Sequence, residues 1–242
     1  RPVASKKEIA AAFSAAHAAQ EKWKRVSLKG RAAFCSAAVD AMLAMRDEIV
    51  PELAWQMGRP IRYGAGELRG FEERARHMIG IAEGALANHV PAAKEGFTRF
   101  ISREPWGVVF TIAPWNYPYL TAVNSVIPAL MAGNAVVLKH ASHTLLVAER
   151  FQKAFDKAGL PKGVFQHLVM NHAQATDVIS GGLVNMACFT GSVAGGRAME
   201  QAAAGRFINV GLELGGKDPA YVRHDANLAH AVENLVDGAF FN

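Results

Sequence analysis

The chain has 242 residues, of which 51% are hydrophobic and 19% are charged, and its formal net charge is +5. This composition is typical of a soluble globular protein, and no apolar run is long enough to span a bilayer. The basic residues are not interleaved with aromatic residues as in nucleic-acid-binding proteins, so we expect no nucleic-acid partner. The sequence has no signal-peptide pattern, and its two cysteines, Cys35 and Cys188, lie far apart. We therefore expect no disulfide framework and a cytoplasmic protein.

The first ninety residues predict a helical segment. The stretch "SKKEIAAAF" places Ser5 and Glu8 at the spacing of a capping box, which marks the start of a helix. Helical periodicity continues over residues 27–58 and 66–89. We expect an interruption at Pro51, because proline removes a backbone hydrogen-bond donor.

From Phe97 onward the pattern changes to strands and then to alternating strands and helices. Residues 97–114 are rich in β-branched and aromatic residues and predict two strands that separate near Pro105. Strands joined by helices predict an α/β fold with a doubly wound, Rossmann-like parallel sheet over residues 106–242. The further strands are expected over 135–139, 163–170, 185–191, 208–214 and 220–224, and the helices over 143–159, 173–180, 192–205 and 227–241.

Four of these strands end in polar or glycine-containing sequences: "APWN", "VLKHAS", "CFTGS" and "LELGG". Ligands of open α/β sheets bind at the carboxyl ends of strands, so these segments are expected to meet in one crevice. Ser192 and Gly191 lie at a predicted helix start, which can bind a phosphate, and Gly196 would let this helix pack closely on the sheet. An ordinary turn with Ser192 as the N-cap explains the same residues.

Glu213 has two interpretations. The segment Gly211–Lys217 matches the start of a phosphate-binding P-loop, but Asp218 and Pro219 replace the hydroxyl residue and helix that such a loop requires. A carboxylate here is either paired structurally or placed to transfer protons. No metal site is expected, because His140 and His143 lack a carboxylate partner. Cys35 and Cys188 are in apolar contexts typical of unreactive thiols.

Taken together, "EPWGVVFTIAPWNYP", "AVVLKHAS", "FTGSVAGGR", "LELGGKDP" and the terminal "FFN" resemble the aldehyde dehydrogenase superfamily in order and spacing. The resemblance implies oxidation of an aldehyde to a carboxylic acid by NAD or NADP, through a cysteine-bound thiohemiacetal and thioester. It implies that Asn116 donates to the oxyanion and that Glu213 is the general base for the deacylating water. The cofactor-binding residues that it implies are Ile112, Pro114, Trp115, Lys139, Ser142, Gly191, Ser192, Gly196, Leu214 and Gly215.

The chain also departs from the superfamily pattern. Ser142 stands where many members have a ribose-binding glutamate, which predicts tolerance of the 2′-phosphate of NADP. The family's cysteine nucleophile lies a few residues beyond "FFN", so we expect the catalytic domain to be absent and the chain alone to bind cofactor at most. Residues 97–105 resemble part of a small oligomerisation sheet, which implies a homodimer or homotetramer at full length. The alternative is a non-catalytic nucleotide-binding module.

Overall fold

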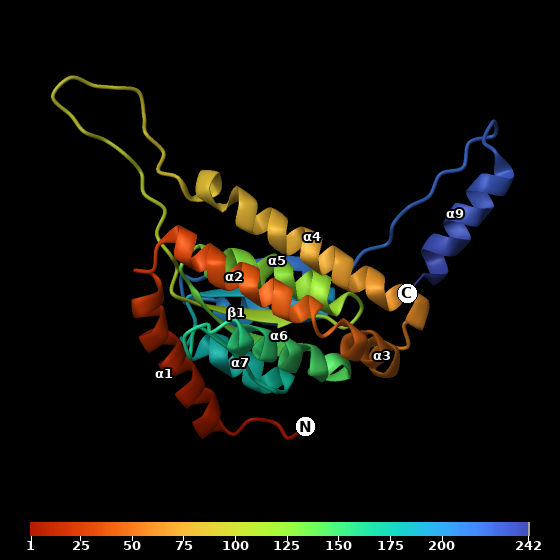
Figure 1. The fold of residues 1–242 in the computed structure, drawn as a ribbon, viewed down its shortest axis with the longest axis horizontal. Coiled ribbons are helices and arrows are strands. Elements are labelled where there is room, and N and C mark those ends of the chain that lie inside the picture. Colours follow the sequence, from red (N-terminus) through yellow and green to blue (C-terminus); the bar gives the residue numbers. More distant parts are fainter. Residues whose placement is uncertain (242) are drawn as a thin grey trace.

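The computed structural model describes residues 1–241, and its centre is a five-stranded parallel sheet. The strand order is β3-β2-β1-β4-β5. This order and the parallel pairing confirm the predicted doubly wound α/β fold (Figure 1). The strands are β1 (Val108–Ala113), β2 (Ala135–His140), β3 (Phe165–His167), β4 (Met186–Gly191) and β5 (Asn209–Leu214).

Helices cover both faces of the sheet. Helix α5 (Pro118–Met131) and helix α6 (Leu145–Lys157) pack on one face, and α7 (His172–Ser180) and α8 (Val193–Ala203) pack on the other. After β3 the chain returns to place β4 beside β1, so the direction of winding reverses between these two strands. A reversal of this kind opens a crevice at the carboxyl edge of the sheet, and this is where ligands bind in such folds.

Four helices precede the sheet, as predicted. They are α1 (Lys6–Trp23), α2 (Leu28–Leu43), α3 (Arg46–Met57) and α4 (Ile61–Leu86). The capping box of Ser5 and Glu8 begins α1. Helices α2, α3 and α4 share a hydrophobic core with α5 and α6. Ile9, Phe13 and Ala16 of α1 pack on the opposite face of the sheet, and Trp23 at the end of α1 joins the first core. None of the helices within residues 1–241 is long and apolar enough to cross a membrane.

The predicted interruption at Pro51 is wrong. Pro51 lies inside α3, and the break falls at residues 44–45, between α2 and α3. A proline inside a helix removes one backbone hydrogen bond. Ile49 and Leu53, on either side of Pro51, are fully buried, and their packing holds the helix in place.

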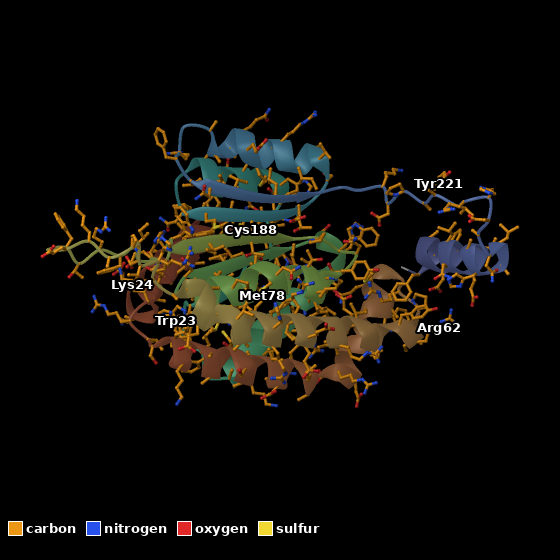
Figure 2. The ribbon with its side chains drawn as sticks, turned by 90° about the horizontal axis from the view of Figure 1, so that it is seen from above. Trp23, Lys24, Arg62, Met78, Cys188 and Tyr221 are labelled. Atoms are coloured by element: carbon orange, nitrogen blue, oxygen red, sulfur yellow. The ribbon has the colours of Figure 1, made fainter. Side chains whose placement is uncertain are left out.

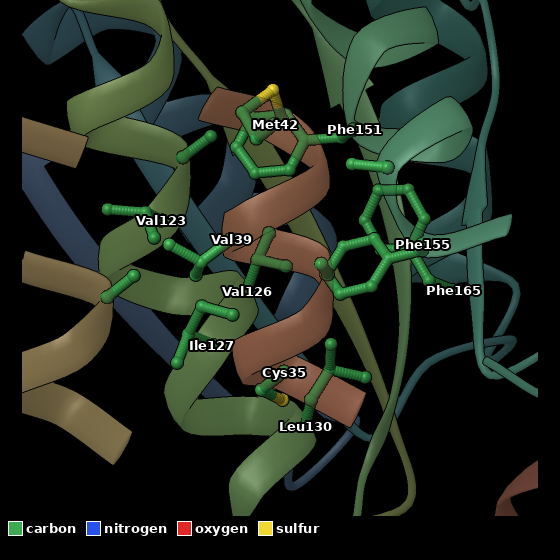
Figure 3. Close-up of a cluster of buried hydrophobic side chains, with 14 of the residues drawn as sticks. Cys35, Val39, Met42, Val123, Val126, Ile127, Leu130, Phe151, Phe155 and Phe165 are labelled. Atoms are coloured by element: carbon green, nitrogen blue, oxygen red, sulfur yellow. The ribbon is translucent and has the colours of Figure 1, made fainter. Parts of the chain in front are cut away.

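The larger core joins the N-terminal helices to the sheet. Figure 3 shows Cys35, Val39 and Met42 on one side of this cluster and Phe151, Phe155 and Phe165 on the other. The rings of Phe155 and Phe165 are 4.5 Å apart between centroids. Because this core is shared, the helical segment and the sheet form one packed body.

Two predicted strands do not form. Residues 97–105 contain only isolated bridge pairings, including His89 with Ile101, and they lie in a loop that projects from the body (Figure 1). Residues 220–224 are also outside any strand. The β-branched and aromatic composition of both segments favours strands. A strand also needs a neighbouring strand for its backbone hydrogen bonds, and neither segment has one within residues 1–241.

The last described segment extends away from the sheet. Residues 215–227 lead to α9 (Leu228–Phe240), which has no buried residue. Figure 2 shows Tyr221 on this extension, apart from the sheet that carries Cys188. The ring of Phe241 returns to the body and packs against Tyr63 of α4, with centroids 4.5 Å apart.

Helix α8 lies very close to β5 at Gly196. A Cβ atom at this position would be 2.5 Å from Cδ1 of Leu214, well inside van der Waals contact. The sequence-based expectation that Gly196 permits close helix–sheet packing is therefore supported by the geometry.

We predict that Gly196→Ala destabilises the protein by about 1–3 kcal/mol, because Leu214 must leave its position to admit the methyl group. Gly80→Ala is the control. Gly80 is helical, as Gly196 is, but it is exposed, and a Cβ atom added there meets nothing within 4 Å. The control is expected to raise stability by roughly 0.4–1 kcal/mol. Urea unfolding of both variants measures the difference, and equal effects would contradict the packing argument.

Candidate functional site

The strand ends carrying the predicted site residues meet at the carboxyl edge of the sheet. In the strand register Lys139 lies beside Ile112, Ile112 beside Phe189, and Thr190 beside Glu213. Side chains alternate between the two faces along each strand. Ile112 and Phe189 belong to the core under α7 and α8, so Lys139 is on that face, whereas Glu213 is on the face covered by α5. The predicted cofactor residue and the predicted base thus lie on opposite faces of one sheet edge.

On the α5 face, Glu213 lines a cleft of about 210 Å³. The cleft lies between β1, β4 and β5 and the first turns of α5. Its lining combines polar and apolar residues, and Ser125 donates a hydrogen bond of 3.1 Å to Thr111 within it. Its lining residues are Thr111, Ile112, Ala113, Thr121, Asn124, Ser125, Cys188, Phe189, Thr190, Gly211, Leu212 and Glu213.

The Glu213 side chain is exposed to solvent. The apolar strand before Glu213 predicts a buried carboxylate that would need a partner, and that prediction is wrong. It forms no ion pair with the residues that the structure describes. A structural ion pair is therefore not what holds Glu213 here, and an exposed carboxylate at a cleft can accept a proton from water.

The two cysteines are protonated thiols. Cys35 is fully buried, and burial raises its pKa to about 12. Cys188 lines the cleft beside Gly211, and partial burial raises its pKa to about 11. The thiolate is the nucleophilic form, so both cysteines are unreactive near neutral pH, as the sequence predicted.

Asn116 lies in the loop between β1 and α5 and is exposed to solvent. Its backbone carbonyl accepts a 2.7 Å hydrogen bond from Nη2 of Arg59. The neighbouring Tyr117 ring lies under the same guanidinium, whose Cζ is 4.7 Å from the ring centroid. Pro118 begins α5, where the fixed φ of proline suits the first helical position. Asn116 is not among the described residues that line the cleft.

Arg59 also forms a buried ion pair with Glu67 of α4, and the two side chains are 1% and 0% exposed. Oε1 of Glu67 accepts the backbone N–H groups of Tyr119 and Leu120, each at 3.0 Å. These N–H groups belong to the first turn of α5, which has no intrahelical acceptor for them. Glu67 therefore caps α5 from a different helix.

Sequence reasoning missed Arg59 and Glu67. The available signal was Glu67 itself, a carboxylate between Gly66 and Leu68 on the side of α4 that packs on α5. Acidic residues are rarely fully buried without a partner, so an acid on a buried helix face indicates a pair.

On the opposite face, Lys139 is 6% exposed, and burial lowers the pKa of its ammonium. Its Nζ donates to the carbonyl of His140 at 3.4 Å, which is a long contact. A buried ammonium with weak hydrogen bonding suits hydroxyl groups of a bound sugar, whose oxygens would accept hydrogen bonds from its remaining N–H groups. Ser142 follows and is exposed at the start of the 3-10 turn Ser142–Thr144.

Ser192 caps the start of α8. Its hydroxyl accepts the backbone N–H of Gly195 at 3.1 Å, so the ordinary capping role that the sequence allowed is present. The other N–H groups of this first turn remain available to an anion at the carboxyl edge. At Gly191 the Phe189 ring lies close to the backbone, and its Cζ is 2.7 Å from the position that a Cβ would take.

The other predicted cofactor residues are distributed along the same edge. Ile112 is buried at the end of β1, Pro114 is half-buried, and Trp115 is 48% exposed. Leu214 ends β5 against α8, and Gly215 follows with a φ of 52°. No helix begins at Lys217, which excludes a P-loop. Asn242, the last residue of the "FFN" motif, lies outside the described residues. No metal-binding cluster is found among residues 1–241.

His140 links the end of β2 to the start of α5. Its Nε2 is 3.2 Å from the carbonyl of Pro118, and its Nδ1 accepts the N–H of Ala141 at 3.0 Å. With Nε2 as the donor, the neutral ring satisfies both contacts, and Thr144 approaches the same Nδ1 at 2.9 Å. Burial lowers the pKa of His140 from 6.5 to about 4.

We predict that His140 makes the protein less stable as pH falls from 6.5 to about 4. Below pH 6.5 the unfolded chain gains a proton on this histidine that the folded chain does not, so the unfolded state is favoured. The loss is on the order of 3 kcal/mol and ends near the folded pKa. Urea unfolding across this range should show a shallower pH dependence for His140→Gln than for the exposed His143→Gln. Identical pH dependences would contradict this assignment.

Comparison with known proteins agrees with this geometry. All residues, 1–242, match the model of the aldehyde dehydrogenase family. The chain is 36% identical to 3,6-anhydro-alpha-L-galactose dehydrogenase of Streptomyces coelicolor, covering 100% of this chain and 49% of that protein. It is 31% identical to a probable succinate-semialdehyde dehydrogenase [NADP(+)] of Synechocystis, covering 98% and 52%.

Solved structures give the same result. The NAD-dependent aldehyde dehydrogenase of Sinorhizobium meliloti superposes with a TM-score of 0.93 at 32% identity, over 99% of this chain and 48% of that one. The chain thus spans about half the length of the relatives it matches. The match over the full chain, together with the fold and the residues at the sheet edge, shows that the chain belongs to the aldehyde dehydrogenase family.

Proposed function

We propose that the whole protein oxidises an aldehyde to a carboxylic acid with NAD or NADP, and that residues 1–242 supply the cofactor site, the oxyanion donor and the general base. The observation that carries this proposal is the separation of Glu213 and Lys139 onto opposite faces of the same carboxyl edge. A cofactor bound on the α8 face and a substrate on the α5 face would meet at the carboxyl ends of β1 and β4, where the direction of winding reverses.

The cofactor would be held by groups of this chain that fit its chemistry. Lys139 offers a buried, weakly hydrogen-bonded ammonium for ribose hydroxyls, and the N-terminus of α8 offers backbone N–H groups for the pyrophosphate. The cofactor's own contribution is to accept a hydride from the substrate. Relatives of both cofactor types are described by name, one as NADP(+)- and one as NAD-dependent.

The reacting groups have distinct roles in this proposal. The Asn116 side chain would donate a hydrogen bond to the oxygen of the substrate as negative charge develops on it. Glu213, at the mouth of the cleft, would remove a proton from the water that releases the acid.

The nucleophile would come from residues after Asn242. The packing of Phe241 on Tyr63 supports this, because Tyr63 lies between Arg59 and Glu67, which hold the Asn116 loop. The chain that follows would begin close to the oxyanion donor. Cys35 and Cys188, as protonated thiols, do not compete for this role.

Two further properties belong to the same proposal. The projecting loop over residues 97–105 exposes Phe97, Phe100 and Ile101, which supports pairing with a second subunit in a homo-oligomer. The two free thiols suit the reducing conditions of the cytoplasm.

We predict that Glu213→Gln in the full-length protein lowers kcat by about 10²–10⁴-fold, because the deacylating water loses its base. Asn116→Ala should lower it by about 10²–10³-fold through loss of the oxyanion donor. Formation of the reduced cofactor is followed by its absorbance, with Glu200→Gln, an exposed acid on α8, as the control. Glu213→Gln should retain the first, pre-steady-state turnover, since hydride transfer precedes hydrolysis. Unchanged turnover in both site variants would overturn the proposed function.

We also predict that Ser142→Glu weakens binding of NADP more than that of NAD, by about tenfold or more, because a carboxylate repels the 2′-phosphate. Titration calorimetry with each cofactor measures the ratio. Ser180→Glu, at the distant end of α7, serves as a charge-matched control. An equal loss for both cofactors would place Ser142 away from the ribose.

A further inference from the structure

We propose that Arg59 and Glu67 are positioning residues that fix the oxyanion donor Asn116. The inference rests on the proposed function, since it concerns how the donor of that reaction is held. Neither residue is assigned a reacting role. Both act through the loop between β1 and α5.

The first observation is the number of bonds that converge on this loop. Arg59 donates to the carbonyl of Asn116 at 2.7 Å and stacks over Tyr117. Glu67 accepts from the backbone of Tyr119 and of Leu120 at 3.0 Å. Four of the five residues 116–120, namely 116, 117, 119 and 120, are therefore held by one pair of side chains.

The second observation is that the pair is fully desolvated. Arg59 and Glu67 are each 3% exposed as residues, and their side chains form an ion pair. Water cannot replace either partner. The geometry of the pair is therefore determined by α4, which carries Glu67, and by the backbone at Arg59 just before this helix begins. A planar guanidinium can bond a carboxylate and a carbonyl at the same time in fixed directions.

The third observation is that other ion pairs of the same helix do not have this arrangement. Arg76 pairs with Glu72 and with Asp40, but these side chains are between 36% and 66% exposed and do not contact the loop. The Glu72–Arg76 pair is thus a matched control on α4. Among the described ion pairs, only Arg59–Glu67 bonds backbone groups of residues 116–120.

The consequence is a specific kinetic signature. Rate depends steeply on the position of the oxyanion donor, and a displacement of about 1 Å can lower it 10²-fold. Arg59→Met should therefore lower kcat on the order of tenfold to a hundredfold with an unchanged cofactor dissociation constant. Arg59→Lys should restore only part of the rate, because its ammonium can pair with Glu67 but lacks the planar group that also bonds the Asn116 carbonyl and stacks on Tyr117.

A double-mutant cycle on the full-length protein tests whether Arg59 acts through Asn116. In the Asn116→Ala background there is no side-chain donor to position, so adding Arg59→Met should cause no further loss of kcat. Independent effects that multiply would contradict positioning and indicate a general loss of structure. Glu72→Gln should leave kcat unchanged in either background.

Hydrogen exchange supplies a readout that does not depend on activity. Glu67→Met removes the acceptor of two amides, so exchange at Tyr119 and Leu120 should accelerate, whereas Glu67→Gln keeps an acceptor oxygen and should protect them. If Arg59→Met fails to fold, Glu67→Gln preserves the shape and tests the charge alone through kcat. Exchange and kcat that stay at unmodified values in Glu67→Met would overturn the proposal. If the unmodified full-length protein oxidises no aldehyde, the proposed function fails, and the exchange experiment still decides whether the pair orders the loop.

Discussion

The alternation of side chains along parallel strands is the constraint on which the candidate site depends. In β5, Glu213 faces α5 and the next residue, Leu214, faces α8 and contacts the position of Gly196. In β1, Ile112 faces the α8 side, and Thr111 is in the row of Cys188 on the α5 side. A register shift of one residue would exchange these faces, so the buried core under each face also fixes which face carries chemistry.

A second constraint comes from charge burial beneath the loop that follows β1. Removing one member of a buried ion pair commonly destabilises a protein by about 3–5 kcal/mol, because the remaining charge has no partner. In the intact Arg59–Glu67 pair, the cost of desolvating the two charges is offset by their mutual attraction and by backbone hydrogen bonds on both sides. Its geometry spans two helices and a strand end, so the first turn of α5 depends on α4 for its capping.

Most of the fold was predictable from the sequence, because periodicity and stop signals are local. The end of α6 before Gly159, which has a φ of 72°, is such a case. The failures involved partners distant in sequence. Residues 97–105 and 220–224 have strand-like composition but no neighbouring strand within residues 1–241. Pro51 was tolerated because of burial that sequence alone does not reveal.

The candidate site follows the same division. The motifs placed Asn116, Lys139, Ser192 and Glu213 at one edge, because parallel strands share a carboxyl edge. They did not reveal that Glu213 is exposed, since an apolar strand suggested burial. They also missed Arg59 and Glu67, whose significance arises from contacts made 50 or more residues away, to Asn116, Tyr119 and Leu120.

Helix α9 carries a consequence for the order in which the chain acquires structure. Its thirteen residues bury no side chain, and isolated helices of about 12–15 residues are marginal in water. Its helicity therefore depends on contacts at its ends, of which the Phe241–Tyr63 stacking is one. Within the described chain the sheet and its helices complete their core without residues 215–241, so this segment can open locally without loss of that core packing. The segment nearest the proposed nucleophile would thus be the last part of the described chain to become ordered.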